Sequence, residues 1–349
     1  MLYLWTDMYF KIWRDLVMGF SISNRRYLGN KRKLLNAIDT VIDSYCGGNV
    51  FVDLFGGTGT VTGHYCEKFE KCIINDLLFS NEIIYKGFFS KGNYDYAKLD
   101  AFAMTLNTIN VEDIEDNYFN QSYGGKYFTT EDALKIGYIR DYIEKERENF
   151  TEKELNILLA SLMYSADRCA NTAGHYEAFL KNKTGRDFYF ELIEPIDNVN
   201  VEIHREDANI LASKIVSDIV FLDPPYNSRD YGQYYHVLEQ IAVWDKKELK
   251  GKTAKPKEIV KSEYCKNTAA DSFRDLIEKL DCKYILVTYN NSFTTSQSSR
   301  NKISYEQMID ILSAKGKLEV FENDYKAFNA GKTNIEGHKE LIFFVTVEK

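Results

Sequence analysis

The residues that most plainly suggest chemistry form one short run, Asp223-Pro224-Pro225-Tyr226. Two of the four prolines of the chain stand here, directly after the apolar run 218–222 (DIVFL). Prolines donate no hydrogen bonds to a sheet and hold the backbone extended, so the pair is expected to end a strand rigidly. Such an ending would fix a carboxylate, a carbonyl and an aromatic ring in one arrangement. The alternative is a plain break between strand and loop with an incidental acid, which the position downstream of a glycine loop disfavours.

The chemistry that fits this arrangement is methylation of an exocyclic amine such as that of adenine. The amine is a weak nucleophile because its lone pair is delocalised into the ring. The carboxylate of Asp223 and the carbonyl of Pro224 could accept its two N–H bonds and direct the lone pair at a methyl donor, while Tyr226 stacks on the base. Methylation of carbon 5 of cytosine would instead need a thiolate nucleophile. No proline in this sequence is followed by cysteine, which argues against that reaction.

A second candidate site is the glycine loop Gly56-Gly57-Thr58-Gly59, which follows the apolar run 49–55 (NVFVDLF). Glycine is needed where the backbone turns sharply and approaches a ligand closely. The next apolar run, 71–75, ends at Asp76, which is placed to accept hydrogen bonds from ribose hydroxyls. The loop is a near miss to the dinucleotide fingerprint, so alone it predicts a nucleoside-bearing cofactor, either a nicotinamide or S-adenosylmethionine. The proline run favours S-adenosylmethionine.

Two regions of different character must position these residues. Apolar runs with helical segments between them predict a parallel sheet covered by helices on both faces. These runs are 49–55, 71–75, 199–203, 218–222, 283–288 and 340–347. Residues 93–198 are instead mostly helical and polar, and two helix starts there have N-cap chemistry, Thr129 with Asp132 and Thr151 with Glu154. The sequence therefore predicts an α/β fold of the Rossmann type with a helical insertion.

The charge of the chain is acidic overall but unevenly distributed. A net charge of −8 argues against a protein that coats nucleic acid by bulk attraction. Two segments are nevertheless basic: 25–33 holds five basic groups and no acid, and 246–261 holds seven lysines against two acids. A local basic cleft is therefore compatible with the composition. The lysines of 246–261 could contact phosphates or simply be solvated.

The remaining features concern the cellular compartment. Six cysteines are scattered without a CxxC pair or a histidine cluster, which suggests neither a disulfide framework nor a zinc site and fits a reduced cytoplasm. No stretch approaches the roughly 20 apolar residues of a membrane span. Residues 1–20 mix aromatic and charged side chains, and we interpret them as a leader of unclear role, with Met18 as an alternative initiator.

Together these motifs resemble the Dam-like adenine-N6 DNA methyltransferases with the alpha motif order, over nearly the whole chain after residue 25. The run RYLGNKRKLL is similar to the family's first cofactor motif, with an aromatic residue and a lysine at the matching positions. DLFGGTG matches the glycine motif, and DPPYNSRDYGQYYHVLEQIAVWD resembles the extended catalytic motif. The resemblance assigns cofactor binding to Tyr27, Lys31, Asp53, Gly57, Gly59, Asp76 and, as a loose match for which a surface acid is the alternative, Asp207.

The resemblance implies a site-specific enzyme that transfers the methyl group of S-adenosylmethionine to N6 of adenine in double-stranded DNA. It would be the modification enzyme of a restriction–modification system, with a cognate restriction endonuclease as its expected partner. The target adenine would have to be flipped out of the duplex. The catalytic domain would comprise residues 21–92 and 199–349, and the insertion 93–198 would recognise the target sequence. The implied catalytic residues are Asp223, Pro224, Pro225 and Tyr226, and the expected DNA contacts are Lys181, Lys183 and Arg186.

Several alternatives stay open on the sequence. The same fold could methylate an RNA base or a protein glutamine, although the RYLGNK run and the long insertion argue against both. The chain could also be a catalytically silent DNA-binding subunit, against which the intact proline run argues. The run 170–186 (ANTAGHYEAFLKNKTGR) could be a plain helix connector instead of a DNA-facing loop. Three tyrosines after the proline run either stack on bases or fill the core: Tyr231, Tyr234 and Tyr235.

Overall fold

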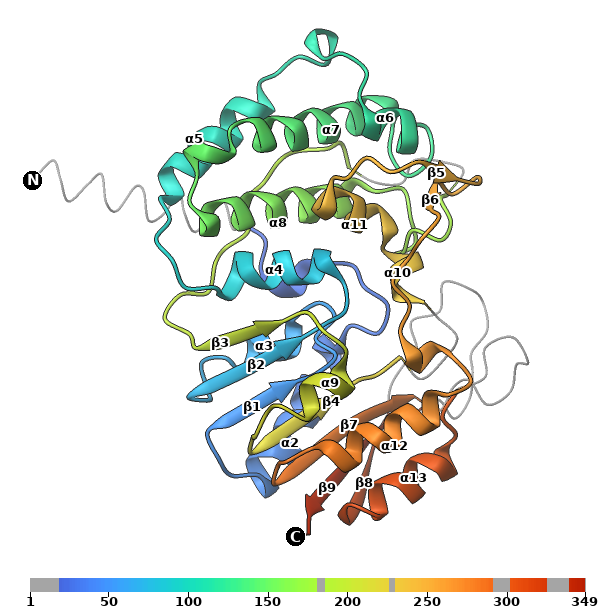
Figure 1. The fold of residues 1–349 in the computed structure, drawn as a ribbon. Helices are drawn as coiled ribbons and strands as arrows, with labels where there is room; N and C mark the ends of the chain where they lie inside the picture. The colour runs from blue at the N-terminus through green and yellow to red at the C-terminus, as the bar shows by residue number, and fades with distance from the viewer. Residues whose placement is uncertain (1–18, 181–185, 226–229, 291–301, 325–338, 349) are drawn as a thin grey trace, which may run out of the picture.

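The computed structural model describes residues 19–180, 186–225, 230–290, 302–324 and 339–348, and the structural statements below concern these ranges. Figure 1 shows a sheet with a layer of helices above it. Within the described chain, seven strands form this sheet in the order β3-β2-β1-β4-β7-β9-β8. They are β1 (Val50–Asp53), β2 (Lys71–Asn75), β3 (Val201–His204), β4 (Ile219–Leu222), β7 (Tyr284–Asn290), β8 (Gly316–Asp324) and β9 (Lys339–Val347).

The strand directions confirm the predicted α/β fold and correct one part of it. Strands β3, β2, β1, β4 and β7 pair in parallel. Strand β9 runs antiparallel to both β7 and β8, so the sheet is mixed at that edge. All six predicted strands are present, but β8 was not predicted. Its alternation of charged and apolar residues (GKLEVFEND) is typical of an edge strand with a solvated face.

The sheet is buried on both faces because successive strand residues contribute to different cores. Phe51 and Ile74 lie in one core, whereas their neighbours Val52 and Ile73 lie in the other. Helices α2 (Leu35–Tyr45), α3 (Thr60–Tyr65) and α4 (Phe79–Phe89) cover the first face. Helices α9 (Ala208–Ala212), α12 (Ala269–Lys279) and α13 (Tyr305–Ser313) cover the second. This two-sided burial explains the near-continuous apolar runs of the sequence.

The helical layer lies between α4 and β3 in the sequence and above the sheet in Figure 1. It comprises α5 (Tyr96–Asn107), α6 (Tyr118–Tyr123), α7 (Thr130–Lys145) and α8 (Glu152–Cys169). The N-caps predicted for two of these helices are present. Thr129 accepts a hydrogen bond from the backbone of Asp132 at the start of α7, and Thr151 forms a reciprocal capping box with Glu154 at the start of α8.

A segment that follows the proline run in the sequence also packs into the helical layer. It contains α10 (Tyr231–Tyr234), α11 (His236–Val243) and a hairpin of β5 (Leu249–Lys250) and β6 (Lys255–Pro256). The Arg140 side chain donates to the carbonyl of Ile241, and the Trp244 ring nitrogen donates to Asp141, both at 2.8 Å. The helical layer therefore combines residues from before and after the proline run.

Five short 3₁₀ helices complete the described secondary structure: η1 (Ile22–Asn24), η2 (Lys31–Lys33), η3 (Val111–Asp113), η4 (Arg147–Asn149) and η5 (Glu263–Cys265). Among the described helices, none combines the length and the apolar character that crossing a membrane would require.

Candidate active site

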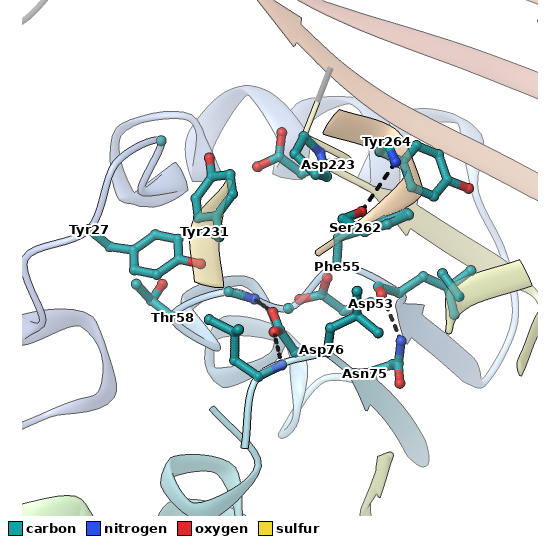
Figure 2. A pocket seen from close by; sticks show the side chains of 18 of the residues that line it. Tyr27, Asp53, Phe55, Thr58, Asn75, Asp76, Asp223, Tyr231, Ser262 and Tyr264 are labelled. Atoms are coloured by element: carbon teal, nitrogen blue, oxygen red, sulfur yellow. Dashed lines mark hydrogen bonds between the residues drawn. The ribbon is translucent and has the colours of Figure 1, made fainter. Parts of the chain in front are cut away.

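One pocket lies at the carboxyl ends of β1, β2 and β4. The order of the sheet reverses between β1 and β4, and ligands of open α/β sheets bind at such a switch point. In Figure 2, Tyr27 and Tyr231 form one side of the pocket, and Phe55, Ser262 and Tyr264 form the opposite side. The fold thereby brings the glycine loop, the 27–31 run and the proline run into one cavity.

The glycine loop turns where a side chain would not fit. Gly57 and Gly59 have φ angles of 53° and 76°, in the left-handed region that favours glycine. A Cβ at Gly57 would lie 3.3 Å from the Tyr27 ring, and one at Gly59 would lie 2.7 Å from Ile22. The bare backbone can therefore run along the pocket wall close to a ligand.

Asp76 is held at the end of β2 by backbone donors. Its Oδ2 accepts a hydrogen bond from the N–H of Gly57 at 3.0 Å, and its Oδ1 accepts one from the N–H of Leu78 at 2.9 Å. Burial raises the pKa of Asp76, although these donors act in the opposite direction. Each carboxylate oxygen has a second acceptor position, so the fixed carboxylate can still accept hydrogen bonds from a ligand.

Asp53, at the end of β1, carries an unsatisfied buried oxygen. The side chain lines the pocket although the residue is only 1% exposed. Its Oδ2 accepts from the hydroxyl of Thr62 at 3.1 Å, but its Oδ1 has no hydrogen-bond partner among the described residues. Burial raises the pKa of Asp53 to about 7. A cationic ligand group such as an ammonium would satisfy this oxygen and favour the ionised carboxylate.

Tyr27 forms an aromatic wall with two tyrosines that follow the proline run. Its ring stacks on Tyr235 at 4.3 Å between centroids and on Tyr231 at 5.4 Å. The hydroxyl of Tyr235 accepts a hydrogen bond from the N–H of Leu28, and the side chain is fully buried. Tyr235 thus fills the core, whereas Tyr231 lines the pocket.

Asp223 lies directly after β4, with a donor on each oxygen. The Lys31 ammonium lies 2.7 Å from Oδ2, and the hydroxyl of Thr288 donates to Oδ1 at 2.7 Å. Burial by itself would lower the pKa of Lys31, but the negative charges of Asp223 and Glu340 and the hydrogen bond to Asp223 outweigh it and raise that pKa. Lys31 therefore lies at the Asp223 end of the pocket. Pro225 also lines the pocket and Pro224 is buried beside it, whereas Tyr226 lies outside the described residues.

Asp207 also lines the pocket. Its Oδ1 caps α9 by accepting hydrogen bonds from the backbones of Asn209 and Ile210. On the side of the pocket opposite Tyr27, the rings of Phe55 and Tyr264 pack edge to face with centroids 5.0 Å apart. Sequence reasoning missed several residues of the site, among them Phe55, Ser262 and Tyr264, which line the pocket, and Thr288, which contacts Asp223. Only Phe55, which adjoins the glycine loop, had a motif beside it that could have identified it.

The structure places the expected DNA contacts only in part. Arg186 is described and exposed, and it does not line the pocket. Lys181 and Lys183 lie outside the described residues. Before them in the chain, the ring of His175 stacks on Tyr234 of α10 at 5.0 Å between centroids. This contact places the end of the helical insertion against the segment that follows the proline run.

The chain is similar to named methyltransferases over most of its length. The chain is 33% identical to the type II methyltransferase M.NlaIII of Neisseria lactamica, over 90% of this chain and 95% of that protein. It is 34% identical to the type II methyltransferase M.CviAII of Paramecium bursaria Chlorella virus 1, over 93% and 98%. It is also 32% identical to the modification methylase StsI of Streptococcus sanguinis, over 92% of this chain and 51% of that protein.

A family model, that of the D12 class N6 adenine-specific DNA methyltransferases, matches residues 27–306. This match spans the glycine loop, Asp76 and the proline run. Enzymes of this family use S-adenosylmethionine as the methyl donor. The chain therefore belongs to the D12 class of N6 adenine-specific DNA methyltransferases and is a DNA adenine methyltransferase of the restriction–modification type.

Proposed function

We propose that the pocket is the active site of this methyltransferase and that Asp223, Pro224, Pro225 and Tyr226 act on the target adenine. The observation that carries the proposal is that one cavity is lined both by the glycine loop with Asp76 and by Asp223 with Pro225. A methyl donor and an acceptor amine must meet within bonding reach, so their sites must be continuous. The same cavity offers a place for each.

The reaction asks the protein mainly to orient the amine. Asp223 Oδ2 and the Pro224 carbonyl accept the two N6–H bonds, and Tyr226 stacks on the flipped base. When bound, S-adenosylmethionine supplies the methyl group on a sulfonium sulfur, so the N6 lone pair forms the N–C bond as the C–S bond breaks and leaves its electrons on sulfur. N6 then releases one proton to water. The protein contributes position and fixed dipoles, with no covalent intermediate.

The residues of the pocket fit the methyl donor. In this proposal, Asp76 accepts from its ribose hydroxyls, and Oδ1 of Asp53 accepts from its ammonium. The turn at Gly57 and Gly59 leaves room for the methyl donor beside Tyr27. Asp207, which also lines the pocket, faces its adenine. The unsatisfied oxygen of Asp53 supports the fit, because a buried acceptor without a partner is costly.

We further propose that residues 21–92 and 199–349 form the catalytic domain and that 93–198 recognise the target sequence, with Lys181, Lys183 and Arg186 contacting double-stranded DNA. A restriction endonuclease of the same target sequence is the proposed partner, as the names of the type II relatives suggest. The proposed compartment is the cytoplasm, which the DNA substrate and the scattered cysteines support.

The test is transfer of a radioactive methyl group to duplex DNA under single-turnover conditions, with saturating DNA and cofactor. We expect Asp223→Ala to lower the transfer rate by at least about 100-fold, because it removes the group that positions the amine, while DNA affinity changes little. Asp281→Ala is the matched control, since Asp281 is exposed before β7 and does not line the pocket. Near-normal transfer by Asp223→Ala would contradict the proposed site.

A further inference from the structure

Thr288 is a buried polar residue in an apolar strand. It lies on β7, where its neighbours Ile285, Leu286, Val287 and Tyr289 all belong to the buried cores, and it is itself only 1% exposed. Burying a hydroxyl costs free energy unless the hydroxyl is hydrogen-bonded. Its bond is directed at the candidate site, because Oγ1 donates to Oδ1 of Asp223 at 2.7 Å.

The register of the sheet determines this contact. Strands β4 and β7 pair in parallel, with Leu222 opposite Val287. Asp223 directly follows Leu222, and Thr288 directly follows Val287, so the two residues lie next to each other. The hydroxyl is therefore held by the backbone of a central strand, which is a rigid support for a catalytic group.

The two oxygens of Asp223 consequently differ in their surroundings. Oδ1 accepts from Thr288, inside the sheet layer, whereas Oδ2 lies 2.7 Å from the ammonium of Lys31. A carboxylate held at one oxygen cannot rotate freely about its Cβ–Cγ bond, so the other oxygen keeps its direction. The Lys31 ammonium shows that Oδ2 can be reached by an N–H donor from the pocket.

We propose that Thr288 is a positioning residue for methyl transfer, because its hydroxyl holds Oδ1 of Asp223 so that Oδ2 is the oxygen presented to the target amine. This inference rests on the proposed role of Asp223 as an acceptor for N6. Thr288 itself touches neither the base nor the methyl donor in this arrangement. It acts through Asp223 and should therefore affect the rate and not the binding of either substrate.

The test compares one substitution that removes the hydroxyl with one that keeps it. Thr288→Val has nearly the same shape without the donor, and Thr288→Ser keeps the donor without the methyl group. We expect Thr288→Val to lower the single-turnover rate about 10- to 100-fold, the effect of one hydrogen bond to a charged group, while the dissociation constants for cofactor and DNA stay within about twofold. Thr288→Ser should restore most of the rate.

A double-mutant cycle separates this inference from the proposed function. In an Asp223→Ala background, Thr288→Val should cause no further loss of rate, because the two residues act as one unit.

Normal transfer by Thr288→Val with an inactive Asp223→Ala enzyme overturns only the role of Thr288. Normal transfer by Asp223→Ala overturns the proposed role of Asp223 itself. Equal losses in the Val and Ser variants, together with lowered melting temperatures, mean a purely structural role and also overturn the inference. If Thr288→Val does not fold, Thr288→Ala takes its place in the same comparisons.

Discussion

At the scale of single residues, three of the carboxylates that line the pocket have different environments. Asp223 is paired with a cation and a hydroxyl, Asp76 is held by backbone N–H groups, and Asp53 is almost fully buried with one unsatisfied oxygen. These environments suit three tasks: orienting an amine, accepting from hydroxyls and accepting from a cation. One residue type can perform all three because each position differs in burial and in hydrogen-bond donors.

Asp76 gives the most direct prediction for cofactor binding. Asp76→Ala removes an acceptor that the backbones of Gly57 and Leu78 hold in place. We expect the dissociation constant for S-adenosylmethionine to rise about 10- to 150-fold, which corresponds to about 1.5–3 kcal/mol for charge-assisted hydrogen bonds. Calorimetric titration of the folded variant measures this, with Asp281→Ala as the control. An unchanged dissociation constant would remove Asp76 from the cofactor site.

Asp53 should make the stability of the cofactor-free enzyme depend on pH. Burial raises its pKa to about 7 in the folded protein, against about 3.9 for an unfolded aspartate. Between these values the folded state binds more protons than the unfolded state, so stability is lost as pH rises towards 7. We expect Asp53→Asn, which cannot ionise, to reduce this loss. Urea denaturation of both proteins at pH 5 and pH 8 measures the difference, and identical pH dependence would refute the assignment.

At the scale of elements, α4 depends on a residue far away in the sequence. Its N-cap position, Leu78, provides no side-chain hydrogen bond. Instead, Glu239 of α11 accepts hydrogen bonds from the backbones of Phe79 and Ser80, at 3.3 and 2.7 Å. The helix that follows Asp76 is thus capped by the helix that follows the proline run. These hydrogen bonds connect the element beside Asp76 to the element that follows the proline run.

Removing this cap should destabilise the protein. We expect Glu239→Ala to lower the free energy of unfolding by about 1–2 kcal/mol, the usual cost of losing an N-cap, and Glu239→Gln to recover part of it because one acceptor oxygen remains. Urea denaturation measures both effects. The exposed Glu248 provides the control substitution, Glu248→Ala. A Glu239→Ala protein as stable as the control would show that α4 needs no such cap.

Elements with a local signal could be predicted from the sequence. The strands with continuous apolar runs and the caps at Thr129 and Thr151 are determined by neighbouring residues, and the structure contains them. The pattern of apolar residues in a buried strand does not depend on the direction of the strand, so the antiparallel direction of β9 was not predicted. The same holds within the site, because Ser262, Tyr264 and Thr288 reach the pocket or Asp223 only through tertiary packing.

At the scale of the whole molecule, the helical layer is connected to the pocket by several bonds. Arg26, next to Tyr27 in the sequence, donates to the carbonyl of Ala170 at the end of α8, and its own backbone N–H donates to Asp167 of α8. The layer that is proposed to read DNA therefore contacts the first cofactor motif as well as α11. Because the chain has a net negative charge, it can bind DNA only where its basic groups gather locally.

Arg186 tests the proposed recognition role of this layer. We expect Arg186→Ala to change DNA affinity or target preference while the dissociation constant for the cofactor stays constant, because Arg186 is exposed and outside the pocket. If Arg186 reads a base, selectivity should relax at one position. If it contacts a phosphate, binding should weaken evenly and the salt dependence should fall by about one unit. Binding measured at several salt concentrations distinguishes the two, and no change in either quantity would exclude Arg186 from the DNA interface.

If residues 93–198 recognise the target sequence, as proposed, the packing of α11 against the helical layer limits how specificity can be exchanged between relatives. Residues 93–198 are not a self-contained cassette, because Arg140 and Asp141 bond to partners at Ile241 and Trp244, beyond the proline run. A foreign insertion would meet an α11 shaped for other side chains. A chimera with a new target sequence would therefore need residues 231–256 to be transplanted together with the insertion.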